Sequence, residues 1–382
     1  MRASSTPYLT NILKIGFILS SFFDYPLRIF FLASAVFAIL ACVGLVLDFS
    51  TFVNFHQFIF LQSFLGAAFA GFLLTALPLW CKIESPLRLL SISLFVLLCL
   101  AFFMQWGLNL GQVVMAVFWF ILLVFCGVYL WRSKNTRNLS LLLVLLGIFT
   151  LSIGKIFINN VNLDYAYIHL CVLAILIVSF RVSLVLGNDA LKDENLSFMP
   201  NAVLKNISSF LLFALIVATL WDKSANLNGF LALSVGFSLF SRLANWHYGV
   251  FFKTHYTFIL YLLFLGTSLV YMGLGLVYLC EFMPLSFILH LLNLLVLLTF
   301  VLFVFNTVSL KHTQNQIFNF TFGTKSSFLA LFVAGFSRGI LALVIGFECF
   351  YIDIPALLVC FAFGYFIYRF TPIYTHNDFK GE

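Results

Sequence analysis

Histidines stand at both ends of one long apolar run, residues 289–313, which reads LHLLNLLVLLTFVLFVFNTVSLKHT. His290 and His312 are 22 positions apart, which corresponds to roughly 33 Å along an α-helix, about the thickness of a hydrocarbon core. Imidazole is the commonest metal ligand in proteins. Because direct bonds from metal to imidazole are about 2 Å long, a single ion cannot use both side chains. If both histidines are ligands, they belong to two separate sites.

Six of the seven histidines sort by depth in the predicted membrane spans. Three lie toward the outer face and three toward the cytoplasmic face: His56, His169 and His290, and His247, His255 and His312. Side chains from facing helices of a bundle can converge as ligands of a metal or a haem. The alternative is that these are interfacial histidines that extend to water.

An arginine, Arg338, lies near the middle of a predicted span in the sequence AGFSRGILALV. An intramembrane arginine indicates function because its charge needs a counter-charge or a wet cavity. We expect no acidic side chain at its depth, so a haem propionate or another anionic ligand would supply the counter-charge. The alternative is pairing with carbonyl and hydroxyl groups near Ser337.

The composition identifies the elements that must position these residues. With 63% hydrophobic residues, 9% charged residues and a mean hydropathy of +1.11, the chain cannot be a water-soluble globule. Twelve apolar windows are long enough to span a membrane as helices. They are 26–48, 53–80, 87–107, 110–131, 138–158, 162–186, 203–221, 227–247, 255–280, 285–309, 327–348 and 354–371. The sequence therefore predicts an all-α, polytopic transmembrane helix bundle of about 12 spans. Small residues four apart in 66–71 predict that the second helix is central and closely packed.

The orientation follows from the basic residues. If the N-terminus is cytoplasmic, all but three of the 20 lysines and arginines lie in or beside cytoplasmic segments. The exceptions are Lys155, Lys223 and Arg338. The positive-inside rule then places both termini in the cytoplasm and explains the net charge of +7 without a nucleic-acid partner. We expect a single integral-membrane domain over 1–382, with two halves, 1–186 and 203–382, joined by a cytoplasmic loop at 187–202.

Several motifs resemble one family along nearly the whole chain. The most specific is His290 followed by Ser309-Leu310-Lys311-His312-Thr313, and the segment 70–80, AGFLLTALPLW, is another. Further matching pieces are PLRIFF at 26–31, Arg137-Asn138-Leu139, Arg181-Val182, His255-Tyr256, Arg338 and 369–372. They resemble the NnrS family, bacterial haem- and copper-containing membrane proteins linked to nitric oxide and nitrosative stress.

The resemblance implies a multi-pass protein of the bacterial inner membrane that binds haem, with copper as a second cofactor. It implies a role in nitric oxide metabolism or in resistance to nitrosative stress, with nitric oxide or another small molecule as ligand. The expected metal ligands are His56, His255, His290 and His312, and Arg338 is a further cofactor-binding residue. One departure concerns the second span, where Phe58 and Ile59 replace the histidine and glutamate of the family's H-x-H-E pattern.

Two alternatives come from other functional classes. The histidines and Arg338 could line the path of a transporter for a small anion or a metal ion. Glycine- or proline-broken helices at matched positions in both halves would favour a transporter, and the sequence has no such matched pair. A catalytic haem or copper protein, an oxidoreductase acting on NO or O₂, would need an open coordination position.

Overall fold

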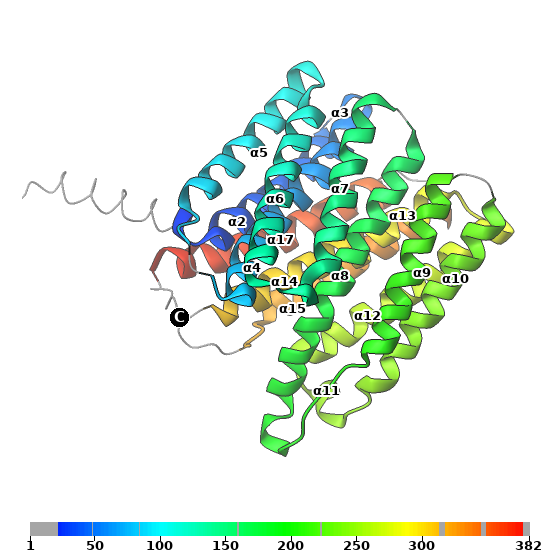
Figure 1. The fold of residues 1–382 in the computed structure, drawn as a ribbon. Coiled ribbons are helices and arrows are strands. Elements are labelled where there is room, and N and C mark those ends of the chain that lie inside the picture. The colour runs from blue at the N-terminus through cyan, green and yellow to red at the C-terminus, as the bar shows by residue number, and fades with distance from the viewer. Residues whose placement is uncertain are drawn as a thin grey trace, which may run out of the picture.

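A computed structural model describes residues 22–47, 49–83, 85–158, 160–221, 224–312, 318–344 and 349–376. These residues form helices and connecting turns, without a strand, so the predicted all-α bundle is confirmed (Figure 1). The first part of the chain contains α2 (Pro26–Leu47), α3 (Phe49–Phe58), η1 (Ile59–Phe64), α4 (Leu65–Cys81), α5 (Arg88–Leu108), α6 (Gly111–Ser133), η2 (Thr136–Asn138), α7 (Leu139–Phe157), α8 (Val161–Ala190) and η3 (Lys192–Glu194).

The second part begins with α9 and ends with α17. Its elements are α9 (Ala202–Trp221), α10 (Ala225–Arg242), η4 (Leu243–Trp246), α11 (Gly249–Lys253), α12 (His255–Cys280), α13 (Leu285–Leu291), η5 (Leu292–Leu298), α14 (Thr299–Lys311), α15 (Phe322–Phe336), η6 (Ser337–Leu341), α16 (Ala342–Val344), η7 (Cys349–Asp353) and α17 (Ile354–His376).

Eleven helical stretches of the described chain are long and apolar enough to cross a membrane. They match eleven of the twelve predicted windows, with ends that differ by at most about four residues. The window 327–348 is not among them. It corresponds to α15, η6 and α16, and its last four residues lie outside the described residues. The cytoplasmic location of the two termini stays a prediction, since 1–21 and 377–382 are also outside them.

The helices pack in a closed succession around α14. Each helix contacts the next in this order: α7, α8, α9, α10, α12, α13 with η5, α15, α17, α2, α4 and α6. The succession closes because α6 also contacts α7. The first and last described spans, α2 and α17, therefore lie side by side, and α14 contacts α8, α12, α15 and α17 (Figure 1).

The helix that carries the small residues is among the most buried, as predicted. A Cβ atom on Gly71 would lie 2.8 Å from Cδ1 of Phe31 and 2.9 Å from Cβ of Phe30. Only a residue without a side chain permits α4 and α2 to approach this closely. This packing fixes η1 and α3, which precede α4, against α2.

Candidate functional site

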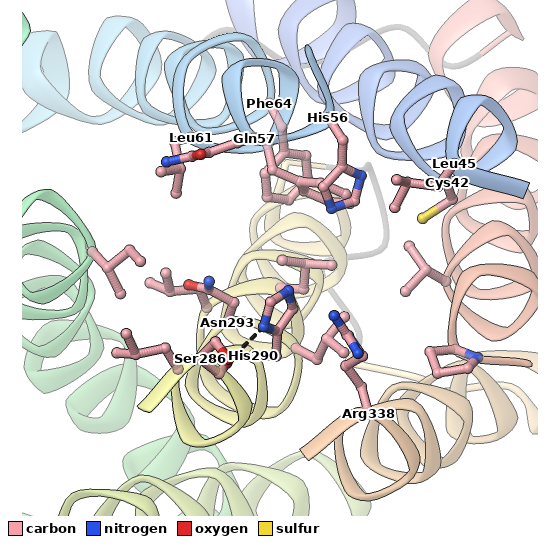
Figure 2. A pocket seen from close by; sticks show the side chains of 18 of the residues that line it. Cys42, Leu45, His56, Gln57, Leu61, Phe64, Ser286, His290, Asn293 and Arg338 are labelled. Atoms are coloured by element: carbon pink, nitrogen blue, oxygen red, sulfur yellow. Dashed lines mark hydrogen bonds between the residues drawn. The ribbon is translucent and has the colours of Figure 1, made fainter. Parts of the chain in front are cut away.

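A cavity of about 300 Å³ lies between six helical stretches (Figure 2). Its wall comes from the end of α2, from α3 and η1, from the start of α8, from α13 and η5, and from η6, η7 and the start of α17. These ends share the side of the bundle predicted to face outward. The polar and titratable residues of the wall are Cys42, His56, Gln57, Asp164, Tyr165, Ser286, His290, Asn293, Arg338 and Tyr351. The other lining residues are mostly leucine, valine, isoleucine and phenylalanine, so the site is apolar with a few convergent polar groups.

Every π-helical segment of the described chain contributes to this wall. The segments η1, η5, η6 and η7 supply, among others, Phe64, Asn293, Arg338 and Tyr351. A π-turn inserts one residue into an α-helix, which rotates the following side chains and often occurs at functional sites. The hydroxyl of Thr299 donates a hydrogen bond of 2.8 Å to the carbonyl of Leu294, five residues earlier, at the end of η5. The widened turns therefore aim side chains into the cavity from four places.

His56 and His290 lie on opposite walls of the cavity (Figure 2). Nδ1 of His56 is 3.2 Å from the carbonyl oxygen of Ala41, and Nδ1 of His290 is 2.7 Å from that of Ser286. A carbonyl oxygen can only accept, so in each imidazole Nδ1 carries the proton and donates. Nε2 then keeps its lone pair. Metal-binding histidines are commonly oriented in this way, with the other ring nitrogen bound to a carbonyl.

Arg338 lies on the same wall as His290 (Figure 2). The carbon Cζ of its guanidinium is 5.9 Å from the ring centre of Phe287 and 5.5 Å from that of Tyr351. No acidic side chain of the described residues forms a salt bridge with it. The acidic residue of the cavity wall, Asp164, pairs with Lys155 instead. Among the described residues Arg338 is thus a cation without a salt bridge, but the prediction that no acidic side chain lies at its depth is wrong, because Asp164 lines the same cavity.

The depth of Arg338 differs from the prediction. The sequence places it midway along a span, whereas the structure places it level with Phe287, at the start of the α13–α14 stretch. Glycines explain the contact. A Cβ atom on Gly339 would lie 2.8 Å from Cβ of Leu291, and one on Gly335 would lie 3.1 Å from Cβ of Leu295. With hydrogen in place of a side chain at these positions, η6 and α15 pack directly on α13 and η5.

The other predicted site residues lie elsewhere. His255 is the first residue of α12 and is exposed, and His312 follows the last residue of α14, at the opposite end from His290. Neither lines the cavity, so the structure brings together His56, His290 and Arg338 and keeps the other two apart from them. Their roles as ligands stay predictions. Of the outer histidines, His169 is fully buried and its Nδ1 lies 3.1 Å from the hydroxyl of Tyr271, outside the cavity.

Sequence reasoning missed several polar residues of the cavity wall. Asn293 lies three positions after His290 and hence on the same helix face. Its polar amide in an otherwise apolar run could have indicated that it belongs to the site. Gln57 follows His56 directly. Cys42 and Tyr165 gave no signal, because cysteine and tyrosine are scattered through many of the spans. Among the described residues no group of three or more His, Cys, Asp or Glu side chains is arranged to hold a metal ion.

The comparison with protein families decides the relationship. The family model described as NnrS protein matches residues 21–377, nearly the whole chain. The chain belongs to the NnrS family. No curated protein and no solved structure matches it significantly. The match includes all residues of the cavity, so the site just described is a site of an NnrS-family protein.

Proposed function

We propose that this NnrS-family protein binds haem between His56 and His290 and acts in nitric oxide metabolism or in resistance to nitrosative stress, in a bacterial inner membrane. The observation that carries the haem proposal is the pair of imidazoles on opposite walls, each with Nδ1 held by a backbone carbonyl. The link to nitric oxide rests on the family resemblance. Bound haem would supply an iron that binds small diatomic ligands.

Haem suits these residues better than copper does. The porphyrin provides four nitrogen ligands, so the protein needs to add only one or two axial ligands. A protein-bound copper ion typically takes three or more side-chain ligands, and no such group exists among the described residues. The apolar wall suits the porphyrin, and the charge of Arg338, which forms no salt bridge with a described residue, suits a propionate. Copper stays a prediction without an assigned position.

The test uses full-length protein purified in detergent, with an optical spectrum, a pyridine haemochrome assay and metal analysis. We expect a Soret band and about one haem per chain. His56→Ala and His290→Ala should each lose haem or shift the band, because each removes an imidazole that would hold the iron. The matched control is His247→Ala, a substitution of an exposed histidine outside the cavity. Folded wild-type protein without a Soret band, or equal loss in His247→Ala, would contradict the haem proposal.

The nitric oxide part is tested separately on the same preparation. Nitric oxide added to the reduced protein should shift the Soret band, and the shift should change in the variants at His56 and His290. Haem-loaded protein that shows no shift would reject the nitric oxide role and leave the haem site standing.

A second candidate function is transport of a small anion, favoured by one observation. Arg338 presents a cation to the cavity without a salt bridge to any described acidic residue. Haem-free wild-type protein that carries an anion into proteoliposomes, and loses this activity in Arg338→Met, would support the transporter in place of the haem protein.

A further inference from the structure

Three cations from three helices gather at the end of the bundle where α8 connects to α9. They are Arg181 on α8, Lys205 on α9 and Arg242 on α10. The hydroxyls of Ser208 and Ser238 lie 2.7 Å apart and fix the register between α9 and α10. Lys205 is three residues before Ser208, and Arg242 is four residues after Ser238. Because the two helices run in opposite directions, both cations lie about one turn beyond this contact, at the same level.

Contacts of Lys205 show that Arg181 lies close to the other two cations. Its ammonium nitrogen lies 5.0 Å from the ring centre of Phe180, the neighbour of Arg181 in α8. Lys205 is also within electrostatic range of both Arg181 and Arg242. The three positive charges therefore repel one another across the α8–α9–α10 junction.

The protein does not neutralise this charge. None of the three cations forms a salt bridge with a described residue. Arg181 donates to the amide oxygen of Asn138 and stacks on Trp80, with Cζ 4.1 Å from the ring centre. The next acidic residue along α8, Asp189, lies two turns further on and accepts a hydrogen bond of 2.7 Å from Tyr256.

Arg242 makes the strongest case for a ligand. It is only 7% exposed, and its Cζ lies 5.1 Å from the ring centre of Phe264, yet no described residue accepts a hydrogen bond from it. None of its nitrogens is completely enclosed, so the guanidinium reaches an accessible surface. A buried guanidinium without an acceptor is strongly unfavourable. An oxyanion in contact with it would remove that penalty and the mutual repulsion of the cluster.

We propose that Arg181, Lys205 and Arg242 bind the phosphate of an anionic phospholipid at the α8–α9–α10 junction. A lipid is favoured over free phosphate because apolar side chains beside the cluster point out of the bundle. Leu184 on α8 is 38% exposed and Phe210 on α9 is 70% exposed, and such residues contact acyl chains in a membrane. Anionic lipids are abundant in the cytoplasmic leaflet, the side predicted for this end of the bundle.

The test is native mass spectrometry of the full-length protein with equal amounts of phosphatidylglycerol and phosphatidylcholine. Wild type should retain phosphatidylglycerol preferentially. Lys205→Gln should lower this preference about fivefold, the effect of one cation near a membrane surface, and Lys205→Arg should keep most of it. The matched control, Lys253→Gln, removes an exposed lysine of α11 at the same end and should behave as wild type.

Two results would overturn the proposal. One is an equal preference in wild type, Lys205→Gln and Lys253→Gln. The other is an effect of inorganic phosphate at millimolar concentration, either displacement of the lipid or a higher melting temperature of the lipid-free protein. Either effect would show that the cluster binds a small soluble anion. The haem content of these variants should equal that of wild type, because the cluster lies outside the cavity.

Discussion

Gly339→Ala tests whether close packing of η6 on α13 positions the wall that carries Arg338 and His290. The new Cβ atom would lie 2.8 Å from Cβ of Leu291 and 3.3 Å from the carbonyl oxygen of Phe287. Favourable carbon–carbon contacts are about 3.5 to 4.0 Å. Leu291 Cβ is attached to the backbone and cannot rotate away, so the two segments must separate by up to roughly 1 Å.

The expected effect is a lower free energy of unfolding. Overpacking of this kind costs about 1 to 3 kcal/mol. The matched control is Gly364→Ala in α17, where a Cβ atom would meet nothing within 4 Å. Both variants gain the same helix preference of alanine over glycine, roughly 0.5 to 1 kcal/mol. The difference between the two variants therefore isolates the overpacking, about 1 to 3 kcal/mol.

The assay is unfolding in mixed detergent micelles, followed by helical circular dichroism, with haem content measured on the same samples. Gly339→Ala should be less stable than Gly364→Ala and should bind haem more weakly, since Arg338 on η6 moves away from His290 on α13. Equal stability of the two variants, within about half a kcal/mol, would refute the role of Gly339 in setting this contact.

Three further outcomes are expected, two from the structure and one from the charges of the sequence. Arg338→Met should insert normally but bind haem roughly 10- to 100-fold more weakly, the effect of losing one charged hydrogen bond; wild-type affinity would reduce Arg338 to a packing role. Gln62→Leu should cost about 1 to 3 kcal/mol, because the indole N–H of Trp119, 3.0 Å from Gln62 Oε1, loses its acceptor. Gln62→Leu combined with Trp119→Phe should recover the part of that loss that comes from the indole, whereas the hydroxyl of Tyr167, 3.5 Å from Gln62 Oε1, still loses this acceptor. Reporter fusions in the loop between the sixth and seventh spans should give a cytoplasmic signal, and a periplasmic signal would overturn the predicted orientation.

The positions of the spans could be predicted because a single physical quantity decides them. A helix crosses the membrane when about 20 consecutive residues are apolar, and this property is local in the sequence. The ends of α12, His255–Cys280, coincide with the predicted window 255–280 for that reason. The stretch α15–η6–α16 is not among the eleven candidate spans, and the last four residues of its predicted window lie outside the described residues.

The convergence of the site could not be predicted in the same way. His56, His290 and Arg338 are far apart in the sequence and lie on helices that are apolar on nearly every face. Such helices have no polar face from which the inward direction could be inferred. The four π-helical turns add a rotation that no simple helical period describes.

The sequence by itself determined that this is a helical membrane protein, where its spans lie, and that His290 and His312 are too far apart to share one metal ion. It placed His56, His169 and His290 toward one face of the membrane and His312 toward the other, but it did not show which of the three outer histidines share a cavity. That choice was decided by tertiary structure: α2 and α17 pack side by side, Gly335 and Gly339 let η6 and α15 approach α13 and η5, and His56 and His290 then meet across one cavity. The physical reason is that the bilayer requires a certain length of apolar residues but does not fix how a helix is rotated about its own axis. That rotation is set by close packing against the neighbouring helices.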